Sequence, residues 1–243
     1  MRNLYLEKKV QFSPKGYKDL LEQFQSIGYK FIKFQRKIDN PRSIILRHDI
    51  DFDIKKAYQI AKIEIGLDIK STFFFLLKSK SYNFLESENQ KLVKEIREMG
   101  HVVSLHFDPS IYKNYKKGLV SEIKLFEELL LDNVSVVSLH RPNKFFLSGL
   151  TLDKKLMHTY ENIFFKQIKY ISDSGGSFKY GYPLDSNAIK NGLPMQLLLH
   201  PIWWTTNKQN AINKLKEFLN YSNSELSNHI SKNCIPWADY LKQ

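Results

Sequence analysis

Four of the seven histidines stand directly after short apolar runs that have the length of β-strands. Carboxylates recur in the same places, which are His48-Asp49-Ile50-Asp51, His106-Phe107-Asp108, His140-Arg141, Asp173 and His200. Two imidazoles and one carboxylate with an open position form the usual ligand set of a hydrolytic zinc site. A metal held in this way acidifies a water molecule and polarises a carbonyl. These residue types therefore indicate metal-dependent hydrolysis, with Asp49 or Asp51 available as base and His200 as acid.

Alternating strands and helices would bring these side chains together. The expected strands are nearly continuous apolar runs, as buried parallel strands are, over residues 43–46, 71–77, 102–105, 134–139, 170–172 and 195–199. Three segments between them have helical spacing: one with Asp53 as N-cap and Gly66 past its end, one opening on a capping box at 87–90 and closed by Gly100, and one over 119–131.

This alternation predicts an α/β fold built from right-handed βαβ units, as an open sheet or as a barrel. In a barrel the carboxyl ends of all strands meet at one rim, which would gather the histidines and carboxylates. No glycine-rich phosphate loop follows the first strand, so the sequence disfavours a dinucleotide-binding fold and favours an incomplete barrel.

The other three histidines are expected to have no part in this site. His101 lies between a predicted helix and a predicted strand, and we expect it to be a turn or capping residue. His158 and His229 lie in polar segments with helical spacing, so we expect both to be exposed.

Length and composition favour one folded domain spanning residues 1–243. Hydrophobic residues make up 42% and charged residues 26%, which excludes a disordered or low-complexity chain. The lone Cys234 cannot form an intrachain disulfide, and residues 1–9 lack the apolar core of a signal peptide, so we expect a cytoplasmic protein. The longest uncharged stretch, 191–207, is broken by prolines, and no membrane span is expected.

The basic excess gives a net charge of +12, but only six of the 37 basic residues are arginine. Base readout favours the planar fork of arginine, and the lysines are scattered along the chain, so nucleic-acid binding is disfavoured. A positive protein attracts anionic small molecules, which makes an acidic or nucleotide-linked substrate the preferred interpretation.

Five motifs, in this order, resemble those of the polysaccharide deacetylase superfamily, also called the NodB-homology or carbohydrate esterase family 4 fold. They are Arg47-His48-Asp49-Ile50-Asp51, Gly100-His101-Val102-Val103-Ser104-Leu105-His106-Phe107-Asp108, Ser138-Leu139-His140-Arg141-Pro142, Tyr170-Ile171-Ser172-Asp173 and Leu197-Leu198-Leu199-His200. The first motif is similar to that of an atypical branch reading Arg-His-Asp-Val/Ile-Asp. The resemblance covers residues 43–204 and implies a distorted (β/α)7 barrel of the NodB type. It also implies metal-dependent removal of an N-acyl group from a sugar.

The resemblance implies a role for each matching residue. Asp49 matches the general base that activates water, and Arg141 matches the arginine that orients this base. His106 matches the first metal-binding histidine. His200 matches the general acid that protonates the leaving amine. Asp173 matches an acidic residue that usually contacts a residue of the site but not the metal or the substrate.

Two positions depart from the family pattern. Ile50 stands where the family has a metal-binding aspartate, and Ser110 stands where it has the second histidine. We infer that Asp51 and His140 replace them beside His106, as ligands of Zn2+ or another divalent metal. The sequence leaves open which carboxylate of the first motif is the ligand and which is the base.

The expected substrate is a small N-acetyl or N-formyl sugar, such as a nucleotide- or lipid-linked precursor of a surface polysaccharide like lipopolysaccharide. Trp203 and Trp204 are expected either to stack on a sugar ring or to cap the barrel core. The departures from the family pattern motivate an alternative, a catalytically inactive sugar-binding protein on the same scaffold. The segments outside the motifs are expected to cover the barrel or to form a contact between two copies.

Overall fold

The computed structural model describes residues 10–242, and along them parallel strands alternate with helices. The strands are β1 (Lys30–Ile32), β2 (Ser43–Ile50), β3 (Thr72–Phe75), β4 (Val102–Phe107), β5 (Val136–Leu139), β6 (Met157–His158), β7 (Lys169–Ser172) and β8 (Met195–Leu198). The α-helices are α1 (Pro14–Ser26), α2 (Ile54–Ile65), α3 (Ser87–Glu98), α4 (Tyr115–Leu130), α5 (Lys144–Ser148), α6 (Asn187–Lys190), α7 (Pro201–Trp204), α8 (Ala211–Asn233) and α9 (Ile235–Tyr240). Residues 1–9, which carry the expectation about a signal peptide, lie outside the described part of the chain.

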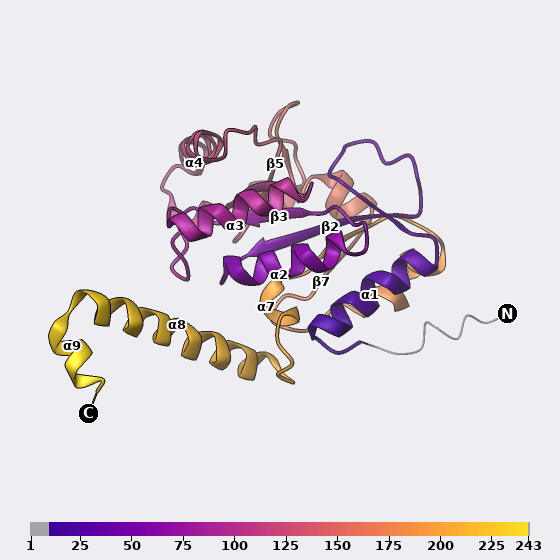
Figure 1. Cartoon of the computed structure of the whole chain (residues 1–243). Coiled ribbons are helices and arrows are strands. Elements are labelled where there is room, and N and C mark those ends of the chain that lie inside the picture. The colour runs from indigo at the N-terminus through magenta and orange to yellow at the C-terminus, as the bar shows by residue number, and fades with distance from the viewer. Residues whose placement is uncertain (1–9, 243) are drawn as a thin grey trace.

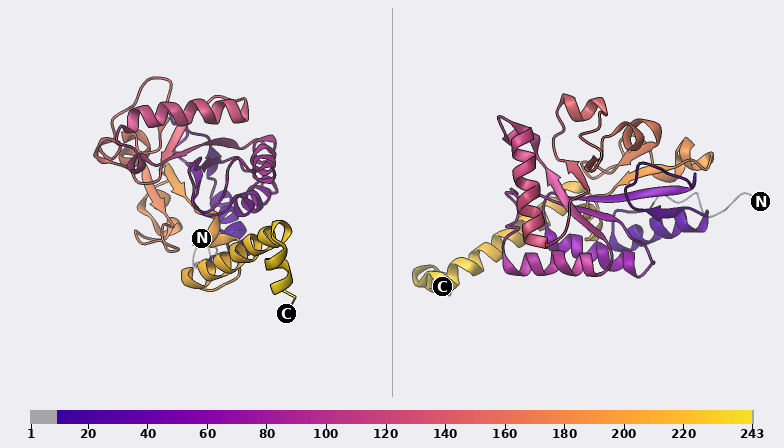
Figure 2. Two further views of the ribbon diagram at one scale, coloured as in Figure 1. Left: turned by 90° about the vertical axis from the view of Figure 1, so that its left-hand side faces the viewer. Right: turned by 90° about the horizontal axis from the view of Figure 1, so that it is seen from above.

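The strands form one parallel sheet that curls into an incomplete barrel (Figures 1 and 2). Seven strands follow the path β6-β5-β4-β3-β2-β8-β7, and β1 pairs with the first residues of β2. Within residues 10–242 no pairing joins β6 to β7, so the barrel is open on that side. The α/β class and the distorted (β/α)7 barrel predicted from the sequence are confirmed.

The helices cover the outer face of the curled sheet, where α2 and α3 lie side by side (Figure 1). Their apolar residues recur with helical spacing, as Tyr17, Leu20, Leu21 and Phe24 do in α1, and they fill the main core between helices and sheet. The Asp53 side chain accepts a hydrogen bond from the Lys55 backbone N–H and caps α2, as predicted.

Two helix starts differ from the prediction. The N-cap of α3 is Glu86, whose carboxylate accepts hydrogen bonds from the backbone N–H groups of Glu88 and Asn89, so the expected capping box begins one residue too late. Helix α4 begins at Tyr115 and not at residue 119, because the Asn114 side chain accepts from the Lys117 backbone N–H one turn earlier than the apolar pattern starts.

Each of the six predicted strands is present with shifted ends, and two short strands were missed. Strands β1 and β6 have three and two residues, too few for an apolar pattern. Strand β2 continues to Ile50, four residues beyond the predicted end, because Arg47 and Asp49 are buried polar residues within the strand. The predicted strand ended at residue 46, before these polar side chains.

Strand alternation divides the residues of β2 between the two faces of the sheet. Ile45 points into the barrel, where it packs with Phe34, Phe74, Val136, Phe164 and Ile168 in a second, smaller apolar cluster. Arg47 and Asp49, two and four residues later, share this inward face nearer the carboxyl end of the strand. The barrel interior is therefore apolar at one end and polar at the rim.

Helix α8 extends away from the barrel, and α9 folds back against its far end (Figures 1 and 2). Of its side chains, Lys214 and Phe218 are buried, both in the first turns. The Trp237 Nε1–H donates a hydrogen bond to Ser227 Oγ at 3.1 Å and fixes α9 on α8. Among residues 10–242 no helix combines the length and apolarity needed to cross a membrane.

Two histidines outside the rim are buried in the neutral form. The prediction that His158 is exposed is wrong, because this residue is fully buried in β6. Its Nε2–H donates to the Leu150 carbonyl at 2.6 Å, and its Nδ1 accepts from the Tyr160 N–H at 3.2 Å. His101 likewise accepts from the Ser71 N–H at Nδ1. Burial lowers the pKa of both imidazoles. For His101, Glu64 opposes the shift and Lys70 adds to it. For His158, Glu161 opposes the shift and Arg36 adds to it. His229 is exposed on α8, as predicted.

We predict that the protein loses stability as the pH falls below about 6.5, the ordinary histidine pKa. The folded pKa values of His101 and His158 are lowered, so the unfolded chain binds more protons in this range and acid favours unfolding, by up to about 1.4 kcal/mol per pH unit for each histidine. Urea unfolding at pH 7, 6 and 5 measures this loss. His101→Gln and His158→Gln should each flatten the pH dependence, while His229→Gln should not. Equal slopes in wild type and both buried variants would contradict the assignment.

Candidate active site

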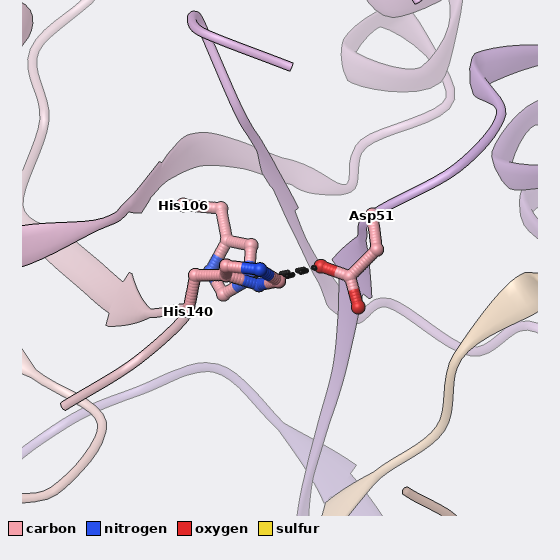
Figure 3. A group of neighbouring side chains, drawn as sticks. All are labelled: Asp51, His106 and His140. Atoms are coloured by element: carbon pink, nitrogen blue, oxygen red, sulfur yellow. Dashed lines mark hydrogen bonds and ion pairs between the residues drawn. The ribbon is translucent and has the colours of Figure 1, made fainter. Parts of the chain in front are cut away.

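Asp51, His106 and His140 converge at the carboxyl ends of three strands (Figure 3). Asp51 follows the end of β2, His106 lies in β4 and His140 follows the end of β5. The Asp51 Oδ1 atom lies 3.2 Å from His106 Nε2 and 3.1 Å from His140 Nδ1, and the two nitrogens are 3.2 Å apart. Residues 51, 106 and 140, far apart in sequence, thus present three electron-pair donors to one point.

The residues present fit a divalent metal ion. Three ligands of a tetrahedral Zn2+ site, each about 2.0–2.1 Å from the ion, lie about 3.3 Å from one another, close to the three distances found. The Asp51 Oδ1 atom is buried and accepts no hydrogen bond of good geometry. His106 Nδ1 lies 2.5 Å from Ser138 Oγ, so Nε2 is the ring nitrogen that faces the site. Two nitrogens and one carboxylate suit Zn2+ and similar first-row ions.

The pKa shifts of Asp51 and His140 also indicate that positive charge between the three residues is favourable. Burial alone would raise the pKa of Asp51, but His106, His140 and the nearby His200 hold it well below its ordinary value. The Asp51 carboxylate in turn raises the pKa of His140. A metal ion bound by the three residues would compete with protons for these ligand atoms.

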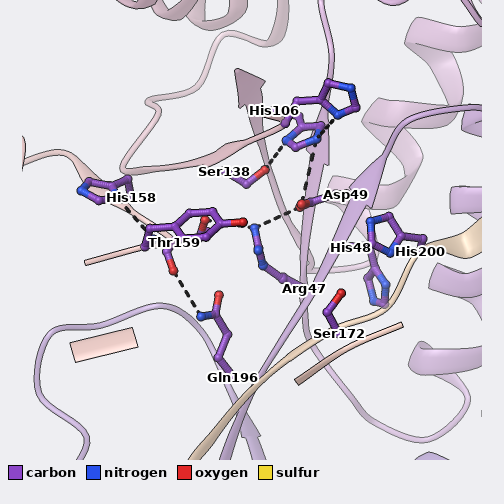
Figure 4. Close-up of polar contacts among 12 residues, drawn as sticks. Arg47, His48, Asp49, His106, Ser138, His158, Thr159, Ser172, Gln196 and His200 are labelled. Atoms are coloured by element: carbon purple, nitrogen blue, oxygen red, sulfur yellow. Dashed lines mark hydrogen bonds and ion pairs between the residues drawn. The ribbon is translucent and has the colours of Figure 1, made fainter. Parts of the chain in front are cut away.

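Asp49 lies beside this cluster with its two carboxylate oxygens in different surroundings (Figure 4). Its Oδ1 faces the Arg47 guanidinium, with 3.2 Å to Nη1. Its Oδ2 lies 4.0 Å from His106 Nε2, close enough to reach a molecule held at the cluster but not in contact with it. The geometry therefore separates Asp51, among the two imidazoles, from Asp49, at their side.

His200 lies on another side of the cluster and is held by Asp173. The His200 Nδ1–H donates to Asp173 Oδ1 at 2.6 Å, and Asp173 Oδ2 accepts from the Trp204 Nε1–H at 2.7 Å. His200 Nε2 lies 3.8 Å from Asp51 Oδ2. Burial would lower the pKa of His200, but Asp173, Asp51 and Asp49 raise it to about 9, so the imidazole is protonated at neutral pH.

The two tryptophans after His200 are buried and pack in the core. Trp204 packs against Phe12, with ring centroids 4.4 Å apart, and its indole N–H binds Asp173. Trp203 packs beside Phe52. Of the two predicted roles, the structure supports capping of the core.

Two residues expected at the rim lie elsewhere. Arg141 is paired with Asp108, with 3.5 Å between Nη2 and Oδ2, and its side chain is 65% exposed, so the prediction that it orients Asp49 is wrong. It follows His140 beyond the end of β5, at the outside of the rim. His48 is adjacent to Asp49 in β2 and therefore faces the opposite side of the sheet, where Nε2 lies 2.8 Å from Glu64 Oε1.

Two supporting residues escaped the prediction. Arg47 contacts Asp49, and Ser138 contacts His106. Each lies in a strand, two residues before a predicted site residue: Arg47 precedes Asp49 within β2, and Ser138 in β5 precedes His140, which follows that strand. Because residues i and i+2 of a strand share a face, strand alternation is the signal that could have found both.

We predict one divalent metal ion per chain, bound by Asp51, His106 and His140. Zn2+ at 100 times its dissociation constant should raise the free energy of unfolding by about 2.7 kcal/mol, and a chelator should remove this gain. His106→Ala and His140→Ala should abolish stoichiometric metal and the gain, whereas His229→Ala, an exposed histidine on α8, should keep both. Unchanged metal content in the first two variants would contradict the site.

Solved structures similar to this chain carry related names. Neither a protein-family model nor a curated protein sequence matches it. A family 4 carbohydrate esterase from Bacillus anthracis is 16% identical, with 85% of this chain and 86% of that chain covered and a TM-score of 0.45. A Streptococcus pyogenes deacetylase solved with acetate is 12% identical over 86% and 88%, with a TM-score of 0.47. A family 4 pseudoenzyme from Bacillus anthracis is 13% identical over 75% and 60%, with a TM-score of 0.42.

Proposed function

We propose that this protein is a metal-dependent hydrolase that removes an N-acyl group from a sugar, as a member of the polysaccharide deacetylase superfamily. The observation that carries the proposal is the convergence of three electron-pair donors from Asp51, His106 and His140 within 3.2 Å of one another, flanked by one carboxylate and one protonated imidazole. A divalent cation held by the three would supply Lewis acidity, which acidifies water and polarises an acyl carbonyl. Amide hydrolysis needs, in addition, a base and an acid at different sides of the carbonyl.

Asp49 is the proposed base. One of its oxygens is held by Arg47, and the other lies 4.0 Å from His106 Nε2, which leaves it free to accept a proton from an attacking water molecule. Asp51 lies directly between the imidazole nitrogens and is the proposed ligand. Their different distances to the imidazoles support this division of roles between the two carboxylates.

His200 is the proposed acid. Its imidazolium is oriented by Asp173 at Nδ1, and Nε2–H faces the cluster from the side of Asp51 Oδ2. In the reaction, the oxygen of water bonds to the acyl carbon and the carbon–nitrogen bond breaks. Asp49 accepts the proton that water loses, and His200 donates a proton to the departing nitrogen. The products are a free carboxylic acid and a sugar amine.

The proposed substrate is a small anionic N-acyl sugar, such as a nucleotide- or lipid-linked precursor of a surface polysaccharide in the cytoplasm. The net charge of +12 supports an anionic substrate, because a positive protein raises the local concentration of such molecules.

The test is a mass-spectrometric screen of N-acetyl and N-formyl nucleotide sugars, including UDP-N-acetylglucosamine, against protein of measured metal content. We expect release of acetate or formate from at least one compound. Asp49→Asn and His200→Gln should each lower kcat by about 100- to 10,000-fold while keeping one metal per chain. His229→Gln serves as the matched control with wild-type turnover.

Two results would contradict the proposal. Metal-loaded protein that binds a sugar from the panel but releases no acid from it would favour the inactive sugar-binding alternative. Acid release that is equal in wild type and Asp49→Asn would show that the reaction occurs without this site.

A further inference from the structure

Arg47 is fully buried inside the barrel, directly below the candidate site (Figure 4). Its Nη1 donates to Asp49 Oδ1 at 3.2 Å and to Thr159 Oγ1 at 3.0 Å. The guanidinium carbon lies 5.8 and 5.9 Å from the ring centroids of Tyr160 and Tyr170, within the range of cation–π contacts. The cation is thus held by one carboxylate, one hydroxyl and two aromatic rings.

This arrangement leaves hydrogen-bonding capacity unused. The Nε and Nη2 groups of Arg47 donate no hydrogen bond of good geometry, although both are buried. Burial of unpaired donors is unfavourable, and a buried ion pair contributes little to net stability compared with apolar residues of the same size. Optimal packing of the barrel interior therefore does not explain an arginine at this position.

The contact with Asp49 gives the arginine a role at the site. A carboxylate can rotate about its Cβ–Cγ bond, and Arg47 prevents this by holding Oδ1. The other oxygen, Oδ2, is then directed toward His106 Nε2 at 4.0 Å. Thr159 fixes the guanidinium in turn, because its hydroxyl accepts from the same Nη1 group.

No other arginine contacts Asp49 among the residues described. Arg141 is directed outward to Asp108. Arg36 binds the Glu161 carboxylate, with Nη2 2.8 Å from Oε1.

We propose that Arg47 is the positioning residue for Asp49, holding its Oδ2 toward the Asp51, His106 and His140 cluster, and that Arg141 has no part in this. The catalytic consequence rests on the proposed function, whereas the pairing itself does not. Lysine cannot replace this arginine fully, because a compact ammonium group lacks the planar guanidinium that packs near the rings of Tyr160 and Tyr170.

The test is a double-mutant cycle of Arg47→Lys and Asp49→Asn, measured on kcat and KM for acid release. Arg47→Lys alone should lower kcat by about 100-fold with KM changed less than about threefold, as expected for a misplaced reacting group. In the Asp49→Asn background the same change should have less than about a twofold effect. Arg141→Met is the matched arginine control, and its effect on kcat should be the same in both backgrounds.

A second cycle, on urea unfolding midpoints, requires no substrate and uses Arg47→Met with Asp49→Asn. Arg47→Met leaves the Asp49 carboxylate buried without its partner and should lower the midpoint, and adding Asp49→Asn should restore part of the loss. If the wild-type protein releases no acid, the proposed function fails and this second cycle alone decides the pairing. Additive effects of the two substitutions in either cycle would overturn the proposal.

Discussion

Mutual repulsion of three electron-pair donors is the constraint on which the rest of the structure depends. A carboxylate oxygen and two imidazole nitrogens lie within 3.2 Å of one another in surroundings that are partly closed to water. Such atoms repel unless positive charge lies among them, as protons or as a metal ion. A fold that brings Asp51, His106 and His140 together must therefore bind protons or a metal ion among them. It must also pack the three side chains so that they stay in place.

The barrel provides buried hydrogen-bond partners for three of the site residues. Ser138 contacts Nδ1 of His106, Asp173 orients His200, and Arg47 holds Asp49. On the other face of β2, the His48 Nδ1–H donates to the Leu199 carbonyl at 2.7 Å and so joins the strand carrying Asp49 to the strand that precedes His200. These contacts lie within the strands or directly after their carboxyl ends, so the sheet sets the geometry of the rim.

The sequence was sufficient for the class of fold and for the six longer strands, because apolar runs of this length are local signals. Prediction from the sequence failed where contacts between distant segments determine the position of a side chain. His158 lies in a polar segment, yet a two-residue strand buries it. Arg141 follows a site residue but points outward, since the chain has already left β5. Arg47 was overlooked as a partner of Asp49 because a charged residue within an apolar run resembles the end of a strand.

The sequence also could not predict which of the two carboxylates lies between the imidazoles. Asp49 and Asp51 are two residues apart, one on each side of Ile50. The difference arises because β2 continues to Ile50, which keeps Asp49 inside the strand and leaves Asp51 where the chain turns across the rim. Strand length, set by pairing with β3 and β8, thus separates the two carboxylates.

X-ray absorption at the zinc edge, on protein loaded with one equivalent of Zn2+, tests the central claim most directly. The account predicts scattering from two imidazoles and from oxygen ligands at about 2.0–2.1 Å, with no sulfur, and loss of one imidazole in His140→Ala. A zinc–sulfur distance near 2.3 Å, or fewer than two imidazoles in the wild type, would place the metal elsewhere and contradict the account.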